Sequence, residues 1–302
     1  MSLILSLRGE TSYTMMALTI GRIELTMYKP EIITNAEYHG RKTHLSSTNI
    51  RTFKKNRKQF EYSLSHELVK QTKAMADGTA VHAFFLERDK FDTDFVIKPA
   101  DMRLNTKVGK EWAQEHQSKI IIDSELGNNL YEMEKSFMDS PAKLIYDIKG
   151  QTELSYFWDD LGTIKGKCRP DWISDDGEIL VDVKTTTDAS PRGFQKSIAN
   201  WGYHLQLGWY LRGLQKLGLD TYDFIFIAIE KTPPFCVGVY RADRDMINFA
   251  MKELDQLMPE IQTAMVSKEF PDYTPEITSI GLPPWMIDKK EQQPEHEEVE
   301  LY

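Results

Sequence analysis

The sequence contains few cysteines and no long hydrophobic run. Its 302 residues include two cysteines, Cys168 and Cys236, too few for a disulfide framework, a four-cysteine zinc site or a four-cysteine iron–sulfur cluster. We expect both thiols to be reduced. No apolar run approaches the roughly 20 residues of a bilayer-spanning helix, and the first seven residues lack the basic start of a secretory signal. These absences predict a globular, cytoplasmic protein with no membrane partner.

The sequence also lacks the net positive charge that is typical of nucleic-acid-binding proteins. Its formal net charge is −9, but the charges are unevenly distributed. Residues 41–73 carry nine Lys and Arg against two Glu, whereas the last twelve residues hold five Glu and no Lys or Arg. Because screening by salt limits the range of each charge to about 8–10 Å, a protein with a negative net charge can still bind DNA through one basic face. Residues 289–302 are predicted to be a disordered acidic tail, and residues 1–37 have no assigned role.

The hydrophobic pattern predicts a helical N-terminal part followed by an α/β part. One amphipathic helix is expected to begin at the N-cap Ser46 or Ser47 and to end near Leu64. Further helical segments are predicted over 75–88, 107–117, 127–139, 190–217 and 243–267. Alternating apolar and polar residues predict three consecutive antiparallel strands over 153–159, 163–174 and 178–186, and two more over 222–231 and 235–243. The predicted fold class is α/β, with a central mixed β-sheet flanked by helices.

The stretch CRPDWISDDGEILVDVKTT, residues 168–186, brings three charged side chains into one hairpin. If residues 176–177 form a two-residue loop, the numbers of paired residues sum to 353, and Asp171 lies opposite Asp182. Alternation along the second strand puts Lys184 on the same face as Asp182, while the apolar residues between them face the core. The hairpin therefore predicts a shared face for the two aspartates and the lysine.

Two carboxylates on directly opposed positions repel each other, because their Cβ atoms are ~4.5–5.5 Å apart. Asp171 and Asp182 therefore need a shared proton, a neighbouring cation or a bound metal ion. Lys184, with Arg169 near it, can supply the cation in an ordinary salt-bridged surface hairpin. An ion held by oxygen ligands alone would be Mg²⁺ or Mn²⁺. The residues leave both interpretations open. If Asp171→Asn relieves the carboxylate repulsion, metal-free stability is expected to rise.

These residues resemble the core signature of the PD-(D/E)XK nuclease superfamily in its Asp-x-Lys form, with Pro170-Asp171 followed by Asp182-Val183-Lys184. Three further elements are similar to its RecB-type exonuclease branch: Gly78 to His82 as G-x-x-x-H, Glu153 at the start of the first meander strand, and Gln206 to Tyr210 as Q-x-x-x-Y. From about Tyr38 to about Trp285 the amino-acid sequence is most similar to RecE-type nuclease domains and their phage-borne relatives.

The resemblance implies a restriction-endonuclease-like core in a single nuclease domain over residues 38–288. This domain would comprise a mainly helical part over 38–150 and a catalytic α/β core over 151–288. The implied activity is metal-dependent hydrolysis of phosphodiester bonds in linear double-stranded DNA, processive in the 5′-to-3′ direction, which leaves single-stranded DNA for recombination. The expected cofactor is Mg²⁺, one or two ions per site, with Mn²⁺ as a substitute.

The resemblance also implies roles for the site residues. The expected metal ligands are His82, Asp171, Asp182, the backbone carbonyl of Val183 and Glu153, which alternatively orients a water. Lys184 would orient or deprotonate the attacking water, or stabilise charge in the transition state. Gln206 and Tyr210 would line the active site.

The basic helix is the predicted DNA-binding surface. Its N-terminus at Ser46 and Ser47 is a seat for a phosphate, and Arg57, which projects off the basic face, is expected in a pocket for the 5′-terminal phosphate. The residues expected on the DNA backbone are Arg51, Lys54, Lys55 and Lys58, with Arg169 as a further candidate. The resemblance implies a ring-shaped homo-oligomer that encircles DNA ends, and a single-strand annealing recombinase of the RecT type as partner.

Three alternatives remain at the level of the sequence. A PD-(D/E)XK endonuclease shares the core but usually lacks the G-x-x-x-H and Q-x-x-x-Y elements. A Cas4- or AddB-like nuclease typically carries a four-cysteine iron–sulfur cluster, which two cysteines disfavour. A catalytically silent DNA-binding module is disfavoured because every ionisable group that the chemistry needs is present.

Overall fold

The computed structural model describes residues 29–66, 73–274, 276–283 and 286. The predicted acidic tail and most of the segment 1–37 lie outside the described residues. The first elements are α1 (Asn35–Gly40), β1 (His44–Leu45), α2 (Ser47–Lys55), α3 (Arg57–Ser63), α4 (Lys73–Leu86), α5 (Arg88–Asp94), β2 (Phe95–Ile97), α6 (Lys107–Glu115), β3 (Ile120–Ile122), α7 (Ser124–Met138), η1 (Pro141–Lys143) and α8 (Leu144–Asp147). They are followed by β4 (Gly150–Thr152), β5 (Tyr156–Asp159), β6 (Lys165–Cys168), β7 (Trp172–Ser174), β8 (Ile179–Thr186), α9 (Pro191–Trp201), α10 (Tyr203–Lys216), β9 (Asp223–Glu230), β10 (Val237–Arg241) and α11 (Arg244–Ser267).

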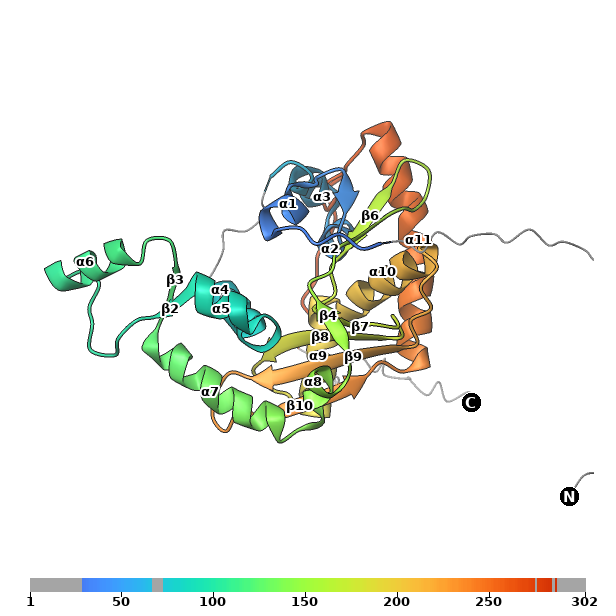
Figure 1. Ribbon diagram of the computed structural model, residues 1–302. Coiled ribbons are helices and arrows are strands. Elements are labelled where there is room, and N and C mark those ends of the chain that lie inside the picture. Colours follow the sequence, from blue (N-terminus) through green and yellow to red (C-terminus); the bar gives the residue numbers. More distant parts are fainter. Residues whose placement is uncertain (1–28, 67–72, 275, 284–285, 287–302) are drawn as a thin grey trace, which may run out of the picture.

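A five-stranded mixed sheet in the order β10-β9-β8-β7-β4 forms the centre of the molecule (Figure 1). Strands β8 and β9 are parallel, and the other neighbours are antiparallel. Leu180 of β8 packs in one apolar cluster with α9, α10 and α11, while Val181 and Val183 pack in a second cluster with α4 and α7. The predicted α/β class with a mixed sheet flanked by helices is confirmed.

Both faces of β8 are buried, which corrects the prediction that only its apolar face packs on the core. Leu180 is fully buried on the supposedly polar face, and Asp182 on that face is 1% exposed. The reason is that α10 covers this face, a layer that the hairpin pattern by itself could not indicate. A buried carboxylate needs hydrogen-bond or ion-pair partners, and Lys184 and Gln206 are the partners of Asp182.

The predicted helix over residues 46–64 is broken into α2 and α3 at Asn56. The backbone of Asn56 is extended (φ −164°, ψ 125°), and its side chain accepts a hydrogen bond from Gln59 N at 2.8 Å. Asparagine is among the preferred N-cap residues, so Asn56 ends one helix and caps the next. Phe53 and Phe60 from the two helices remain packed edge to face in the core.

The predicted helix over residues 190–217 is also broken, at Gly202. This residue has φ 65° and ψ 37°, the left-handed conformation in which glycine commonly ends helices. A Cβ atom at this position would lie 3.1 Å from the Cδ atom of Arg51. The break makes Tyr203 the first residue of α10, where its ring lies 4.8 Å from the Nζ atom of Lys184.

The predicted strand over residues 163–174 is divided between two sheets. Its first part, β6, pairs with β5 and β1 in a three-stranded sheet, while its second part, β7, pairs with β8 and β4 in the central sheet. Pro170 lies at the crossing, where it has no N–H to donate to either ladder. The register sum of 353 is confirmed by the pairs Trp172 with Val181 and Ile173 with Leu180.

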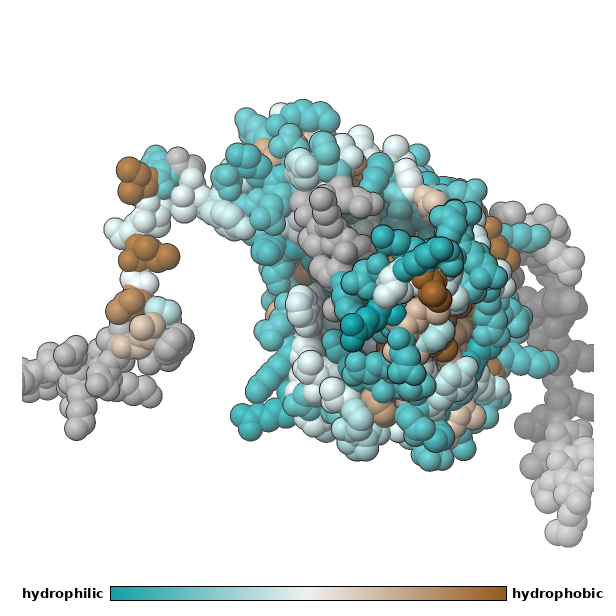
Figure 2. All heavy atoms as spheres, turned by 90° about the vertical axis from the view of Figure 1, so that its left-hand side faces the viewer, coloured by the Kyte–Doolittle hydropathy of each residue, from teal (hydrophilic) through white to brown (hydrophobic). Residues whose placement is uncertain are grey.

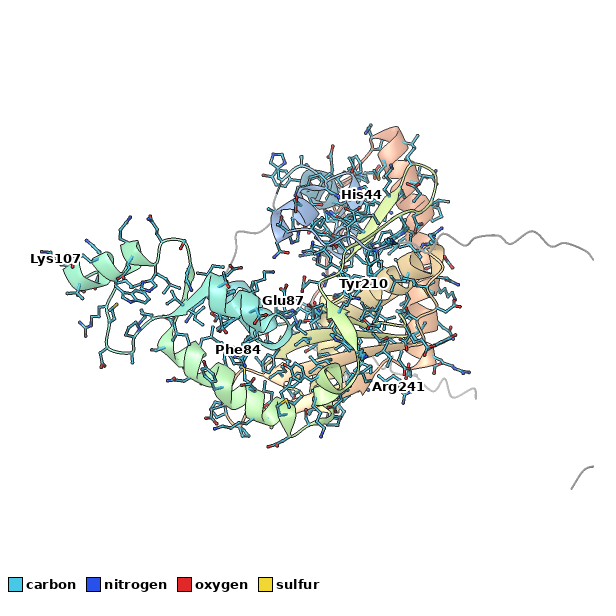
Figure 3. The ribbon with its side chains drawn as sticks, in the orientation of Figure 1. His44, Phe84, Glu87, Lys107, Tyr210 and Arg241 are labelled. Carbon is cyan, nitrogen blue, oxygen red and sulfur yellow. The ribbon has the colours of Figure 1, made fainter. Side chains whose placement is uncertain are left out.

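The parallel pair β2-β3 (Phe95–Ile97 and Ile120–Ile122) and helix α6 extend away from the body of the molecule (Figure 1). The side of the molecule from which α6 projects is covered mainly by hydrophilic residues, with a few hydrophobic ones among them (Figure 2). Phe84 of α4 lies between α4 and α7 in the second apolar cluster (Figure 3).

Both cysteines are free, as expected, with Cys168 buried and Cys236 exposed. Among the described helices, none has the length and apolar character needed to cross a membrane.

Candidate active site

Three predicted metal ligands from three separate segments meet at the edge of the central sheet. One ligand atom from each of His82, Glu153 and Asp171 lies within 4.8 Å of the other two. His82 comes from α4, Asp171 directly precedes β7, and Glu153 lies in the link between β4 and β5. An imidazole nitrogen and two carboxylates are a set of donors that can hold a divalent metal ion.

Asp171 lies where β7 separates from β8. Its Oδ2 atom accepts a hydrogen bond from Val183 N at 2.6 Å and lies 3.4 Å from His82 Nδ1. Burial opposes the charged carboxylate, but the attraction of His82 and Lys184 and the Val183 hydrogen bond outweigh it, so the pKa of Asp171 is lowered. Burial likewise opposes the imidazolium form of His82, but the Asp171 carboxylate outweighs it, so the pKa of His82 is raised.

Glu153 does not open a strand of the meander as predicted. Its backbone has φ 55°, an uncommon conformation for a residue other than glycine, and its N–H donates to the carbonyl of Asp171 at 3.3 Å. Burial and the neighbouring Asp171 carboxylate raise the pKa of Glu153 to about 7. A cation bound beside these two carboxylates would relieve both effects.

Asp182 and Lys184 form a buried ion pair on β8. The Lys184 Nζ atom lies 2.5 Å from Asp182 Oδ2, and the two side chains are 16% and 1% exposed. Burial and the Asp171 charge raise the pKa of Asp182, against the lowering effect of Lys184. Burial lowers the pKa of Lys184, but the attraction of Asp182 and Asp171 is larger and raises it. Lys184 is therefore an ammonium at neutral pH.

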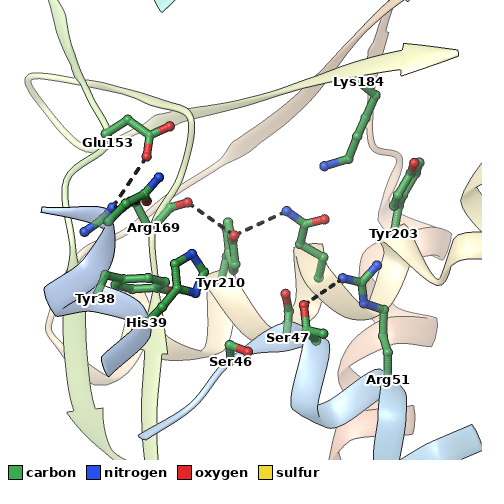
Figure 4. A pocket seen from close by; sticks show the side chains of 13 residues that line it. Tyr38, His39, Ser46, Ser47, Arg51, Glu153, Arg169, Lys184, Tyr203 and Tyr210 are labelled. Carbon is green, nitrogen blue, oxygen red and sulfur yellow. Dashed lines mark hydrogen bonds and ion pairs between the residues drawn. The ribbon is translucent and has the colours of Figure 1, made fainter. Parts of the chain in front are cut away.

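A chain of hydrogen bonds from α10 fixes the Asp182 carboxylate. The Nε2 atom of Gln206 donates to Asp182 Oδ1 at 2.6 Å and to the Tyr210 hydroxyl oxygen at 3.2 Å. The Tyr210 hydroxyl in turn donates to the carbonyl of Arg169 at 3.2 Å (Figure 4). Burial raises the pKa of Tyr210 well above its ordinary value, so this donor keeps its proton. Gln206 and Tyr210 thus position Asp182.

A pocket of about 330 Å³ opens above these groups (Figure 4). Glu153, Lys184, Gln206 and Tyr210 line it, together with residues that the sequence analysis did not assign to the site: Asn35, Tyr38, His39, Thr48 and Tyr203. Asn35 belongs to the segment 1–37, which had no predicted role. Periodicity could not indicate it, because its place depends on a tertiary contact with Arg169.

Arg169, predicted near Lys184 and as a DNA-binding residue, is held within the fold. Its guanidinium donates to Ser155 Oγ, Asn35 Oδ1 and the carbonyl of Ile33 at 2.8, 2.9 and 3.1 Å. Its Nη1 atom also lies 3.9 Å from Glu153 Oε2. These contacts show that Arg169 connects the N-terminal segment to the site; a DNA contact through it stays a prediction.

Arg57 does not line the catalytic pocket, and its expected contact with a 5′-terminal phosphate stays a prediction. It begins α3 and forms an ion pair with Glu260 of α11, because the break at Asn56 redirects the chain. Arg51, expected on the DNA backbone, lines the pocket instead, beside Ser46 and Ser47. Its Nη1 atom donates to the carbonyl of Trp201 at 2.8 Å, while its buried Nε has no partner among the described residues.

The remaining predicted DNA contacts lie along α2 and α3. Lys54 pairs with Glu253 and Lys58 with Asp272, so both are engaged within the chain. No carboxylate of the described residues pairs with the exposed Lys55. Their contacts with DNA stay predictions, as do metal ligation by Asp182 and by the carbonyl of Val183.

The mixed sheet flanked by helices, the cluster at its edge and the adjoining Asp-x-Lys pair define a nuclease domain of the PD-(D/E)XK class. The chain belongs to the family described as a PDDEXK-like domain of unknown function, DUF3799, whose model matches residues 46–282. The predicted superfamily is thereby confirmed, while the closer likeness to RecE-type domains stays a prediction.

Among solved structures, a presumed exonuclease from Eubacterium rectale is similar, with a TM-score of 0.59 at 14% identity over 84% of this chain and 97% of that chain. An identity this low shows the fold alone. The structure of the protein SSO0001 aligns with a TM-score of 0.28 at 13% identity, over 75% of this chain and 88% of that one, and carries no argument. No curated protein matches this sequence.

Proposed function

We propose that this protein is a metal-dependent exodeoxyribonuclease that digests linear double-stranded DNA from its ends in the 5′-to-3′ direction. The observation that carries the proposal is the cluster of His82, Glu153 and Asp171 next to the Asp182–Lys184 ion pair. The ring-shaped oligomer and the recombinase partner belong to the same proposal and rest on the resemblance alone.

The donors present fit a divalent cation, Mg²⁺ with Mn²⁺ as a substitute. His82, Glu153 and Asp171 would hold it, and Asp182 would join them if its contact with Lys184 loosened. A bound ion supplies neutralisation of the phosphate charge and a lowered pKa of water. The raised pKa of Glu153, which burial and Asp171 cause, supports this fit, because it marks carboxylate charge that lacks a compensating cation.

The protein's own groups would perform the remaining tasks. As an ammonium, Lys184 suits the stabilisation of negative charge that develops on the phosphate in the transition state. Its raised pKa argues against the alternative role of deprotonating the attacking water. Gln206 and Tyr210 hold Asp182 in place.

Linear and covalently closed circular duplexes of the same sequence test the proposal. With Mg²⁺ we expect the linear duplex to disappear from its 5′-phosphorylated strand, while the circle stays intact, since it offers no end. With EDTA both should persist. Denaturing gels of DNA labelled at either end give the polarity. Cleavage of the closed circle would instead indicate an endonuclease, and no cleavage of either would indicate a silent binding module.

Arg51 is expected to bind the 5′-terminal phosphate, because Arg51 and the N-terminal residues Ser46 and Ser47 of the α2 segment line the pocket. The Nε atom of Arg51 also has no partner among the described residues. Replacing Arg51 with alanine should raise the KM for 5′-phosphorylated duplex by about 10-fold and reduce the preference for 5′-phosphate over 5′-hydroxyl ends. The ratio of kcat/KM values for the two ends measures this effect, and a general loss of stability does not change the ratio. Arg57→Ala is the matched control, and an equal change in both variants would contradict the assignment.

A further inference from the structure

A second cavity, of about 790 Å³, adjoins the catalytic pocket on the side of α2 and α3. We call it the α2–α3 groove; its lining residues are His39, Lys42, His44, Ser46, Thr48, Asn49, Thr52, Lys55, Gln59, Ser63, Leu64, His66 and Lys167. Three of them, His39, Ser46 and Thr48, line the catalytic pocket as well. A polymer that lies in the catalytic pocket can therefore continue directly into the groove.

The charge of the groove is opposite to that of the protein. The whole chain has 46 acidic and 37 basic residues, but the described lining includes three lysines, three histidines and no aspartate or glutamate. No described carboxylate pairs with Lys42 or Lys55, in contrast to Lys54 and Lys58. A concave surface with one sign of charge concentrates ligands of the opposite sign, so the groove suits a polyanion.

Lys167 lies at the floor of the groove. The residue is 4% exposed, and its ammonium donates to the carbonyls of Tyr38 and Arg41 at 2.7 and 2.9 Å. Burial, followed by repulsion from Lys42, Arg169 and Arg41, lowers the pKa of Lys167 to about 8. The group is still mainly charged at pH 7, and a bound anion would relieve the repulsion among these cations.

Flat rings accompany the charges. The His66 ring stacks on Tyr62 with a centroid distance of 4.1 Å and an angle of 10°, and His44 meets Phe157 edge to face at 5.2 Å. His44 lies in the part of the molecule built by α1, α2 and α3 (Figure 3). Basic grooves with ring side chains are typical of sites for single-stranded nucleic acid, because unpaired bases stack on the rings while phosphates meet the cations.

We propose that the α2–α3 groove binds a single-stranded segment of DNA that is continuous with the strand in the catalytic pocket. The proposal rests on the proposed nuclease function, since a cleaved strand has to lie in the catalytic pocket. Binding of the strand in the groove does not itself require cleavage. Paired bases are hidden inside a duplex and cannot stack on the ring of His66, which lines the groove, so this ring favours an unpaired strand.

Binding of a fluorescein-labelled ten-nucleotide oligo-dT to the full chain, measured by anisotropy in EDTA, tests the proposal. We expect the double variant Lys42→Ala/Lys55→Ala to bind the strand about 10-fold more weakly. The slope of log K against log salt concentration should fall by about 1.4, since each phosphate contact with a single strand contributes about 0.7. Lys107→Ala/Lys110→Ala on α6 removes the same charge far from the groove and should leave both values unchanged.

An equal loss of affinity in the α6 control variant would overturn the proposal, because the effect would then be one of overall charge. Unchanged affinity in the groove variant would also overturn it, as would a loss seen only with a duplex of the same length. Because EDTA prevents cleavage, these results do not depend on nuclease activity. A protein that binds the strand as expected but leaves linear DNA intact would refute the proposed activity and keep the groove.

Discussion

Replacing Lys184 with alanine is expected to lower kcat on linear duplex DNA by about 10³-fold. The ammonium of Lys184 is a cation that the chain itself supplies next to the cluster, and removing one such preorganised charge typically costs 10²–10³ in rate. The change also leaves Asp182 buried without its partner, which costs about 3–5 kcal/mol of stability if the carboxylate stays charged. Single-turnover kinetics at saturating DNA measures the rate, and urea titration measures the free energy of unfolding.

The loss of rate has to be separated from the loss of stability. The assay is run at a temperature at which near-ultraviolet circular dichroism shows the variant to be folded. Lys184→Arg keeps a cation on the same face and should retain more activity than the alanine variant. Added ethylammonium should restore part of the rate of the alanine variant. A folded Lys184→Ala protein with a rate within 10-fold of the wild type would refute the role of this residue.

Replacing Asp171 with asparagine is expected to weaken Mn²⁺ or Mg²⁺ binding by about 100-fold, because the variant removes one of two carboxylates from the cluster. Losses of 10–100-fold are already typical when only a residue behind the ligands is changed. Isothermal titration calorimetry of the metal-free protein measures the affinity. Asp176→Asn, an equal change of charge in the turn of the same hairpin, is the control and should bind metal like the wild type.

The same variant, Asp171→Asn, also tests whether the charge of Asp171 lowers or raises the stability of the metal-free protein. Repulsion between opposed aspartates predicts that neutralising Asp171 raises metal-free stability, but in the structure His82, Lys184 and the N–H of Val183 stabilise its anion. Because the pKa of Asp171 is lower in the folded protein than its ordinary value of 3.8, its charge stabilises the fold at pH values above 3.8. This stability is lost as the pH falls through the lowered pKa. Asp171→Asn should therefore lower metal-free stability at pH 7 by about 1–3 kcal/mol, and an increase would restore the repulsion argument.

Local patterns predicted well what depends on local chemistry. The turn at residues 175–178 sets the hairpin register, so the pairing of Trp172 with Val181 followed from the sequence. The breaks at Asn56 and Gly202 also had local signals, an N-cap residue and a helix-ending glycine. The apolar periodicity nevertheless continues across both positions, so the pattern of apolar residues alone predicts one continuous helix in each case.

Other features had no local signal. Pro170 ends one ladder, but nothing near it indicates that β6 and β7 belong to different sheets. Arg51 and Arg57 both look like basic helix residues, and only the redirected start of α3 brings Arg57 to Glu260 and leaves Arg51 at the pocket. The contribution of Asn35 depends on Arg169, which is 134 residues away in the chain.

The sequence by itself determined the family of this protein. The order and spacing of His82, Asp171, Asp182 and Lys184 carry the resemblance to PD-(D/E)XK nucleases, because the side chains and their order along the chain are properties of the sequence. The tertiary structure decided how these groups share their work: His82, Glu153 and Asp171 form one cluster, and Asp182 is held by Lys184 and Gln206. That division arises because α4 and α10 cover opposite faces of one sheet, and the packing of layers is a long-range property of the chain.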